Sequence, residues 1–457
     1  MVMKNTLRGG ESTARLLFSG AFLWFLGIVG VGMSSLARLA LSEGFSVAGE
    51  DRRVEAVTSV AGVTVFPEGA PLPAGVSAVI YTAAVSPDHP TVVEAARRGI
   101  PIVSRADFLA YLMRGSRARV TVAGSHGKTT VTAMLDAILV RAGRRPTTVS
   151  GGTLTDGGTY RYGARDVFLA EACEYADSFL SLSPTHALLL NLELDHTDYF
   201  PDYAALSRSA ARYLSRAETR IVPPPLLSLA GEGNVLTFSA QDAGAILTAR
   251  GIRLTPGGAE ATLVFRGEDA GKLTLPVPGT HNLSNALAAI LTARSLGVPF
   301  GTSAGALSDF TLPDRRLTLR GRWGGALWYD DYAHHPSEIR ASLSALRVLC
   351  TGRLTVAFQS HTYSRTKAEL SGFAAALREA DSVLVLPIFP ARETDDLGVS
   401  NETLARETGA KATATPDFET AANEMKKAAR PGDVMVVMGA GDVNEIFNFL
   451  GSFGEKA

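Results

Sequence analysis

A glycine-rich loop between a strand and a helix constrains the fold of this chain more than any other sequence feature. The loop is GSHGKTT, residues 124–130; it follows the apolar run ARVTVA and opens the periodic stretch TVTAMLDAILVRAG. Backbone N–H groups of such a loop, at the positive end of a helix, can surround phosphate oxygens. Lys128 would reach the β- and γ-phosphates of a nucleotide, and Thr129 would hold Mg²⁺. Val122 stands where the usual GxxxxGK[ST] pattern has its first glycine, so an exposed turn with an incidental lysine is the alternative.

Strand, turn and helix segments recur along the 457 residues, which predicts parallel sheets covered by helices. Near the N-terminus, FLWFLGIV, GVG and MSSLARLALSEG follow one another in that order. The chain is too long for one core, at about 100–200 residues per domain. We therefore predict an α/β protein of three domains. The first, residues 1–118, is Rossmann-like. The second, residues 119–313, is a central P-loop domain with a mostly parallel sheet and a hairpin-like region around 231–277. The third, residues 314–457, is a C-terminal Rossmann-like α/β domain.

Composition and charge argue against several classes of partner. Lys and Arg number 44 against 45 Asp and Glu, so the chain has no global basic field for nucleic acid. The two cysteines form neither a disulfide framework nor a metal-ligand spacing, which is typical of a reducing compartment. The apolar run at 23–31 is shorter than the roughly 20 residues of a membrane span. We expect a cytoplasmic monomer or homodimer without membrane or nucleic-acid partners; because Lys4, Arg8 and Arg15 precede the run, a signal peptide is the alternative.

Acidic residues and histidines gather where predicted strands end. Glu171 and Glu174 close the apolar strand DVFLAEA, and Asp195 and His196 follow the strand HALLLNLE. Ligands of open α/β sheets bind at the carboxyl ends of the strands, so these residues are candidate ligand groups. Solvated acids on a turn are the alternative for the two glutamates. Six of the eight histidines fall within short polar motifs: His126, His196, His281, His334, His335 and His361.

Six motifs taken together resemble one enzyme family. GSHGKTT, EACEYADSFL, NLELDHTDYF, HNLSNA, DDYAHHP and FQSHTYSRT occur in the order found in the Mur ligases of peptidoglycan synthesis, and the resemblance covers the chain from about Phe22. Each motif alone is weak, whereas their order is specific. The resemblance implies a ligase that uses ATP to convert the lactyl carboxylate of UDP-N-acetylmuramate into an acyl phosphate. It also implies that L-alanine then attacks this acyl phosphate.

The resemblance further implies the residues of the ATP and metal sites. Thr129, Glu174 and His196 would hold metal; because Mg²⁺ prefers oxygen donors, Asp195 is a further candidate and Mn²⁺ is expected to substitute. Asn282 could instead only cap the helix that follows it. The implied ATP-binding residues are Gly124, Ser125, His126, Gly127, Lys128, Thr129, Thr130, His281, Asn282, Asn285, Arg316, Asp331 and Tyr332.

By the same resemblance the third domain receives the amino acid. Arg365 would stabilise negative charge, because a guanidinium group suits an acyl phosphate or a carboxylate; a plain surface arginine is the alternative. The base that takes the proton of the amine stays open among His335, His334 and Asp331. The implied amino-acid-binding residues are His334, His335, His361 and Tyr363, and the implied catalytic residues are Lys128, Glu174, His196, Arg365 and His335.

A second glycine turn lies near the N-terminus. Gly27, Gly30 and Gly32, with an acid about twenty residues on, nearly reproduce a dinucleotide fingerprint, although the pattern is GxxGxG rather than GxGxxG. Alone it would suggest NAD. In the family the corresponding turn holds the pyrophosphate of the UDP-sugar, and Val29 replaces one of its usual glycines. The implied UDP-sugar-binding residues are Gly30, Val31, Gly32, Met33, Ser34, Asp51 and Thr82.

Three other functions stay open. A recycling ligase that adds a preformed tripeptide to the same UDP-sugar would carry the same motifs, but it needs a larger acceptor pocket than this short third domain suggests. A non-catalytic nucleotide-binding regulator would be expected to lose metal ligands, and Lys128, Thr129, Glu174 and His196 are all present. An NAD-dependent dehydrogenase rests on the first glycine turn alone.

Overall fold

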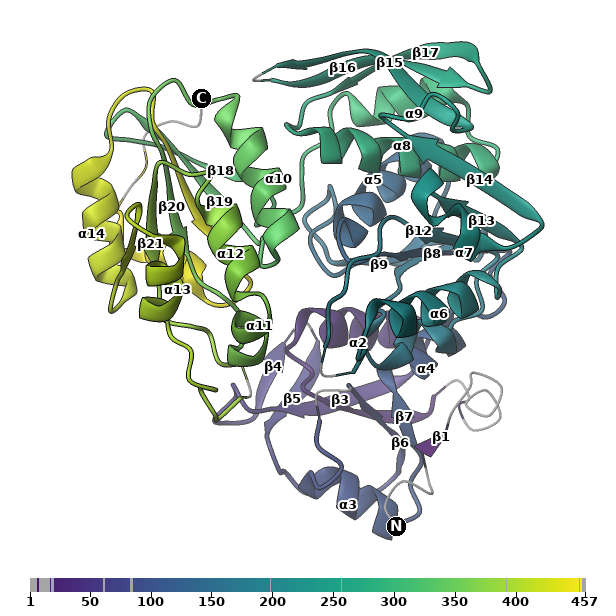
Figure 1. Cartoon of the computed structure of the whole chain (residues 1–457). Coiled ribbons are helices and arrows are strands. Elements are labelled where there is room, and N and C mark those ends of the chain that lie inside the picture. The colour runs from purple at the N-terminus through teal and green to yellow at the C-terminus, as the bar shows by residue number, and fades with distance from the viewer. Residues whose placement is uncertain are drawn as a thin grey trace. The chain divides into compact units, whose positions relative to one another are not determined.

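The structure, a computed structural model, describes residues 6–7, 17, 20–60, 62–82, 85–197, 199–255, 257–391, 393–451 and 453. These residues form three sheets, mostly parallel, with helices packed against them (Figure 1). The chain divides into two compact units, Met1–Ala249 with Leu263–Gly271 and Asn285–Leu307, and Arg250–Thr262 with Lys272–Ser284 and Ser308–Ala457. The α/β prediction is confirmed, and each predicted domain carries one sheet. The exact boundaries at 118 and 313 stay a prediction.

The N-terminal sheet has the strand order β1-β7-β6-β2-β3-β5-β4 and is parallel except where β4 meets β5. Its central strand is apolar throughout because both faces are buried. Leu23 and Phe25 pack into one hydrophobic cluster, while Trp24 and Leu26 pack into another. The elements are β1 (Thr6–Leu7), β2 (Phe22–Leu26), α2 (Val31–Ser42), β3 (Ser46–Asp51), β4 (Thr58–Val60), β5 (Val63–Pro67), β6 (Val76–Tyr81), α3 (Pro90–Arg97), β7 (Ile102–Ser104) and α4 (Arg105–Met113).

The central sheet runs β10-β9-β11-β8-β12-β13-β14, with a parallel core and an antiparallel edge where β10 meets β9. The region predicted as hairpin-like contains the strands β14 to β17. The elements are β8 (Ala118–Ala123), α5 (Lys128–Arg141), β9 (Thr147–Val149), β10 (Tyr160–Arg161), β11 (Val167–Glu171), η2 (Tyr175–Ser181), β12 (His186–Leu189), α6 (Tyr203–Leu214), β13 (Thr219–Val222), η3 (Pro224–Leu226), α7 (Leu227–Ala230), β14 (Asn234–Ser239), β15 (Leu247–Thr255), β16 (Gly258–Phe265), β17 (Glu268–Leu275), α8 (Thr280–Ser295) and α9 (Phe300–Leu307).

The C-terminal sheet has the order β18-β19-β23-β20-β21-β22, parallel except for β18. Alternate residues of β23 enter two clusters: Val436 packs with α10 and α12, and Val437 packs with α14. In Figure 1 these helices lie on opposite faces of the sheet. The elements are β18 (Thr318–Trp323), β19 (Ala326–Asp331), α10 (Pro336–Arg347), β20 (Leu354–Phe358), α11 (Tyr363–Ala368), α12 (Leu370–Leu377), β21 (Ser382–Val385), α13 (Asn401–Thr408), β22 (Ala412–Ala414), α14 (Phe418–Ala428), β23 (Val434–Met438) and η4 (Val443–Phe449).

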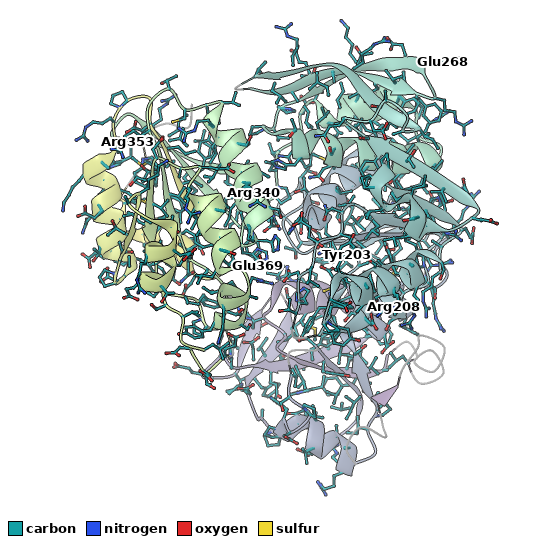
Figure 2. All side chains as sticks on the ribbon, viewed as in Figure 1. Tyr203, Arg208, Glu268, Arg340, Arg353 and Glu369 are labelled. Carbon is teal, nitrogen blue, oxygen red and sulfur yellow. The ribbon has the colours of Figure 1, made fainter. Side chains whose placement is uncertain are left out.

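Helix α6 illustrates a helix that covers a sheet with one apolar face. Leu206, Ala210 and Tyr213 are buried at helical spacing. Tyr203 and Arg208 project from the same helix and are exposed (Figure 2). Among the described residues, no helix is both long and apolar enough to cross a membrane. The signal-peptide alternative depends on three basic residues that lie outside the described part of the chain: Lys4, Arg8 and Arg15.

Candidate active site

The predicted phosphate loop joins β8 to α5, and its backbone requires glycine. Gly127 caps α5 with φ +85°, a left-handed conformation that side chains rarely adopt. A Cβ atom there would also lie 2.7 Å from Oδ1 of Asn285. This places Asn285, predicted to contact ATP, beside the loop. Ser125, His126, Lys128 and Thr129 are half-buried along the loop, and Thr130 is buried.

Two residues that follow β12 hold the loop in place. The side-chain oxygen of Asn191 accepts from His126 N–H at 2.8 Å, and its amide group donates to the His126 carbonyl at 3.0 Å. The backbone of Glu193 bonds to the Ser125 hydroxyl, and its carboxylate lies 3.3 Å from Nε2 of His126. The motif NLELDH contains both residues, but the sequence reading singled out neither. Their position directly after an apolar strand was the available signal.

The loop lysine is paired with a predicted metal ligand. Nζ of Lys128 lies 3.1 Å from both carboxylate oxygens of Glu174 and also donates to the carbonyls of Gly124 and Ser125. Burial acts to lower the pKa of Lys128, but the charges of Glu174, Cys173 and Glu171 and the hydrogen bond to Glu174 together outweigh it, and the pKa lies above its ordinary value. The lysine is therefore charged. The strands β11, β8 and β12 are neighbours, so their carboxyl ends bring Glu174, the loop and His196 to one edge of the sheet.

His196 stands at the third strand end and faces the same glutamate. Its Nε2 lies 4.0 Å from Oε1 of Glu174 and 3.9 Å from Oδ2 of Asp195. The backbone of His196 has φ +55°, and such strain is characteristic of functional positions. Tyr175 packs against the imidazole, with ring centroids 4.8 Å apart. A carboxylate, an imidazole and the Thr129 hydroxyl thus offer donors that divalent cations accept.

The second glycine turn opens α2, at the carboxyl end of β2. Gly30 caps the helix, and Val31 in its first turn is 49% exposed, so the turn is open to solvent. Val29 N–H donates to Asp51 at 3.0 Å, and Arg53 pairs with the same carboxylate at 3.0 Å. Burial acts to raise the pKa of Asp51, but the hydrogen bonds from Arg53 and Val29 outweigh it and the pKa is lowered. Asp51 is thus occupied in shaping the turn.

The remaining predicted residues of this site are in or beside the same turn. Gly32, Met33 and Ser34 lie in the first turn of α2, and Thr82 follows β6. Because β6, β2 and β3 are neighbours in the sheet, the loop after β6, the glycine turn and Asp51 share one edge. That edge is where open α/β sheets bind ligands.

In the second unit, two arginine side chains lie against the ring of Tyr332, which directly follows β19. The guanidinium carbons of Arg315 and Arg316 each lie 5.1 Å from the ring centroid of Tyr332. Arg315, which was not predicted, also donates to the carbonyls of Gly439 and Gly441 at 2.6 and 3.0 Å. Arg316 and Tyr332, both predicted to contact ATP, are therefore neighbours.

His281 and Asn282 lie in the first turn of α8, which begins at Thr280. The Asn282 amide donates to the Pro278 carbonyl at 2.7 Å, so Asn282 stands inside the helix rather than at its cap. Burial lowers the pKa of His281 to about 4, which leaves the ring neutral at neutral pH. A neutral imidazole can both donate and accept a hydrogen bond.

The predicted acceptor residues cluster beside β19 and β20. The ring centroids of His334 and His361 lie 6.4 Å apart. Burial lowers the pKa of His334 to about 4, and its Nδ1 lies 3.0 Å from the Tyr332 carbonyl, so that nitrogen carries the proton. Glu338 accepts from His334 N–H at 3.0 Å and pairs with Arg316 at 3.7 Å. Glu338 was missed, although an acid in the first turn of the following helix was visible in the sequence.

The three candidate bases differ in how they are held. His335 caps α10, with Nδ1 2.8 Å from the hydroxyl of Ser337, so one ring nitrogen serves the helix. Burial raises the pKa of Asp331 to about 6, close to the range of a working base. His334 is a weaker base because of its low pKa. The assignment of the base stays open.

Arg365 and Tyr363 lie on the short helix α11, which begins at Tyr363. The N-cap Thr362 has φ +67° and its hydroxyl accepts from Arg365 N–H. Glu393 fixes the same turn by accepting from Ser364 N–H at 2.9 Å. Arg365 is close enough to His334 to help lower the pKa of that histidine. The acceptor residues named from the sequence therefore share one region of the second unit.

Comparisons with known proteins agree over most of the chain. Models for three Mur ligase domains match, namely the catalytic domain at residues 23–117, the middle domain at 122–293 and the glutamate ligase domain at 315–441. A protein of Lachnospira eligens named UDP-N-acetylmuramate–L-alanine ligase is 38% identical over 440 residues, which cover 92% of this chain and 96% of that protein.

Two solved structures have the same architecture. The UDP-N-acetylmuramate–alanine ligase of Thermotoga maritima aligns with a TM-score of 0.79 at 25% identity, covering 94% of this chain and 98% of that one. A murein peptide ligase from Psychrobacter arcticus aligns with a TM-score of 0.71, also at 25% identity and with the same coverage.

Proposed function

The chain belongs to the Mur ligase family, and from that premise we propose that it uses ATP to join L-alanine to the lactyl carboxylate of UDP-N-acetylmuramate, in the synthesis of peptidoglycan precursors. The observation that carries the proposal is the pairing of Lys128 with Glu174 at 3.1 Å beside the glycine loop. A charged lysine and a buried carboxylate at the carboxyl ends of neighbouring strands suit phosphoryl transfer, which depends on positioning and charge stabilisation. The L-alanine specificity rests on relatives such as the Lachnospira eligens ligase.

The P-loop side of the site would hold ATP. Backbone N–H groups between Gly124 and Thr130 would receive the phosphates at the N-terminus of α5. The ammonium group of Lys128 would separate from Glu174 and stay close to the negatively charged γ-phosphate during the transfer. Asn285, beside Gly127, together with His281, Asn282 and Arg316, would contact the remainder of the nucleotide.

The residues around Glu174 fit a divalent cation. Glu174 and Asp195 supply carboxylate oxygens, Thr129 a hydroxyl and His196 an imidazole, a donor set that accepts Mg²⁺ and Mn²⁺. Thr129, Glu174 and His196 would hold the metal. A bound cation would supply neutralisation of the phosphate oxygens as charge builds up on them.

In the first chemical step, a lactyl carboxylate oxygen would attack the γ-phosphorus. The bond between that phosphorus and the β–γ bridging oxygen breaks, and ADP leaves with the electron pair. In the second step, the amine of L-alanine would attack the acyl carbon and lose a proton, and phosphate leaves. Arg365 would stabilise the negative charge of the acyl phosphate, and His334, His335 or Asp331 would take the proton.

The glycine turn at the start of α2 would bind the UDP-sugar. The open first turn would offer the N–H groups of Val31 and Gly32 to the pyrophosphate at the positive end of the helix, since those of Met33 and Ser34 donate to the Gly30 carbonyl. Asp51 would keep that turn in shape through Val29 rather than contact the sugar itself. Since ATP and UDP-sugars are cytoplasmic metabolites, we place the reaction in the cytoplasm.

Phosphate release from ATP in the presence of UDP-N-acetylmuramate tests the proposal. We expect release that depends on L-alanine, with glycine and L-serine weaker and a preformed tripeptide inactive. Release with the tripeptide alone would assign the chain to the recycling reaction. No release with any acceptor would leave a nucleotide-binding regulator.

A further inference from the structure

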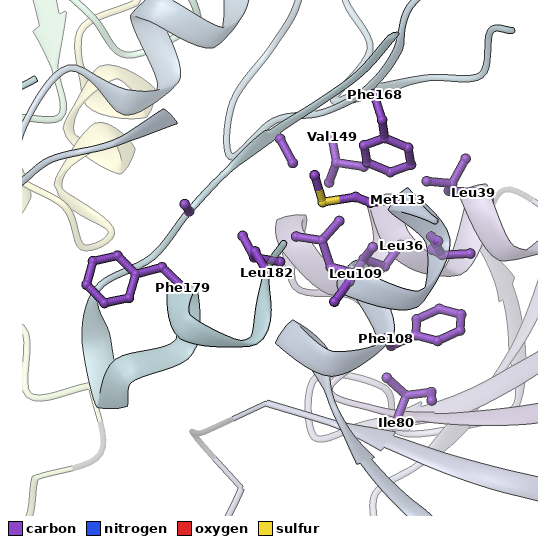
Figure 3. Close-up of a cluster of buried hydrophobic side chains, with 14 of the residues drawn as sticks. Leu36, Leu39, Ile80, Phe108, Leu109, Met113, Val149, Phe168, Phe179 and Leu182 are labelled. Carbon is purple, nitrogen blue, oxygen red and sulfur yellow. The ribbon is translucent and has the colours of Figure 1, made fainter. Parts of the chain in front are cut away.

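The β9–β10 hairpin lies between the two helices that open at glycine turns. α2, with its predicted UDP-sugar turn, packs against β9 and β10, and α4 packs against η2. Figure 3 shows part of the hydrophobic cluster at this junction, in which side chains of α2 and α4 lie near Val149 of β9 and Phe168 of β11. Members of that cluster are Leu36, Leu39, Phe108, Leu109, Met113, Val149, Phe168, Phe179 and Leu182. The N-terminal and central sheets are therefore parts of one compact unit.

A relay of hydroxyl groups connects the hairpin to the first turn of α2. The Ser35 hydroxyl donates to the Val31 carbonyl at 2.9 Å, and Ser35 is fully buried. The Thr159 hydroxyl lies 2.7 Å from Ser35 Oγ, so the two hydroxyls share a hydrogen bond, and the Ser35 hydroxyl also lies 3.4 Å from the Thr159 carbonyl. The relay ends at Val31, one of the residues predicted to hold the UDP pyrophosphate.

The two strands of the hairpin are also fixed to α5, the P-loop helix, through Thr148 and Arg161. Arg161 of β10 donates to both carboxylate oxygens of Asp136 on α5, with Nη2 at 3.0 Å and Nε at 3.2 Å. Thr148 of β9 donates to the same carboxylate at 2.6 Å. Asp136 is fully buried, and buried bidentate pairs of this kind fix geometry closely.

We propose that this hairpin is a spacer that sets the UDP-sugar turn against the phosphate loop, with Ser35 and Thr159 as positioning residues for the ligation. The inference rests on the proposed function, in which the lactyl carboxylate is delivered from the α2 turn and the γ-phosphate from the α5 loop. Reacting atoms must approach to about 3–3.5 Å, and a misplacement of about 1 Å can cost about a hundredfold in rate. Neither residue touches a reacting group.

A matched pair of substitutions tests the spacer. Thr159→Val removes the hydroxyl and keeps the shape, while Thr159→Ser keeps the hydroxyl. Ser42→Ala is the control on the same helix, because Ser42 is exposed and bonds only within α2. The dissociation constants of ATP and of UDP-N-acetylmuramate are measured separately, and kcat is measured with L-alanine.

We expect Thr159→Val to lower kcat about tenfold while both dissociation constants stay within about twofold of wild type. Thr159→Ser should restore kcat, and Ser42→Ala should match wild type. Adding Ser35→Ala to Thr159→Val should lower kcat little further, because Thr159→Val already removes the hydroxyl link between the hairpin and Ser35. If kcat is unchanged in Thr159→Val, or falls equally in Thr159→Val and Thr159→Ser, the spacer proposal is wrong. Turnover by the wild type would still support the proposed function in that case. Absence of turnover in the wild type would overturn both.

Discussion

The two glycine turns, at residues 27–30 and 124–127, share a plan but differ in their charged groups. Each follows a parallel strand and opens a helix. In the first turn, Val29 N–H donates to Asp51, which Arg53 neutralises. The second turn is followed by Lys128, which pairs with Glu174 at 3.1 Å. The first turn contributes backbone N–H groups alone, whereas the second adds a cation and a carboxylate.

This difference separates binding from chemistry. Backbone N–H groups at a helix end suffice to hold a pyrophosphate that does not react. Transfer of a phosphoryl group also needs charges placed where negative charge develops. The glycine spacing of the first turn resembles a dinucleotide fingerprint, but its charged groups shape the turn and do not supply a reactive centre. Five substitutions test this difference, and they are described in order of decreasing expected effect.

Lys128→Ala should abolish phosphoryl transfer at the second turn and leave UDP-sugar binding at the first turn intact. We expect kcat to fall by about a thousandfold or more, the range seen when a cation that stabilises a phosphoryl-transfer transition state is lost. Affinity for UDP-N-acetylmuramate, measured by calorimetry, should stay within about twofold. Lys272→Ala, at an exposed lysine, is the control. A large loss of UDP-sugar affinity would mean that the two nucleotide sites have been exchanged.

Glu174→Gln should separate the role of the carboxylate from that of the lysine. The amide keeps the shape but loses the charge, so we expect kcat to fall about a hundredfold and the Mg²⁺ concentration at half-maximal rate to rise. Titration of the rate with Mg²⁺ measures both effects, with Glu268→Gln at an exposed site as control. If the Mg²⁺ requirement did not change, Glu174 would serve only to hold Lys128.

How much of this contrast could be read from the sequence depends on the distance between partners. The apolar strands FLWFL and VMVVM were predictable because both faces of their sheets are buried. Lys128 and Glu174 were predictable as strand-end groups, and the structure brings them together. The pair Ser35 and Thr159 was not, because 124 residues separate them. Asn191 and Glu193 were missed for the same reason, since their bonds to the loop span 65 to 68 residues. The roles of the site residues stay predictions.

The shared hydrophobic cluster of the N-terminal and central sheets also could not be predicted from the sequence. The apolar face that α2 and α4 present to the central sheet has no pattern that distinguishes it from an ordinary core face. Only the three-dimensional packing of Leu36 and Met113 with Val149 and Phe168 reveals the shared cluster. His335 illustrates a similar limit, because its use as a helix cap is a local geometry that the motif DDYAHHP does not specify.

Alanine at one left-handed glycine of each turn should affect the two nucleotides separately. Gly127→Ala meets both a left-handed φ of +85° and Asn285 Oδ1 at 2.7 Å, whereas Gly27→Ala meets only a φ of +70° with nothing within 4 Å. The strain of about 1–2 kcal/mol per residue predicts about tenfold weaker UDP-sugar binding for Gly27→Ala. The added clash predicts about a hundredfold weaker ATP binding for Gly127→Ala. Equilibrium binding of each nucleotide to each variant checks this, and crossed effects would contradict the assignment.

Asp51→Asn should have the smallest effect, on stability rather than on turnover. The lowered pKa of Asp51 means that its contribution is present above the ordinary value of 3.8 and is lost as the pH falls through the folded-state pKa. We expect a loss of about 1 kcal/mol at pH 7, measured by urea unfolding, that shrinks in acid below pH 3.8. Asp88→Asn, at an exposed position, is the control. A loss that is independent of pH would show that the charge of Asp51 does not matter.

If the lactyl carboxylate is activated by phosphorylation, one of its oxygens must pass to phosphate, and isotope labelling detects that transfer. UDP-N-acetylmuramate carrying ¹⁸O in both lactyl carboxylate oxygens is incubated with ATP and L-alanine, and the released phosphate is analysed by mass spectrometry. An acyl phosphate passes one carboxylate oxygen to phosphate, so the account predicts one ¹⁸O in each phosphate formed during ligation. Unlabelled phosphate, released while the peptide bond forms, would contradict it.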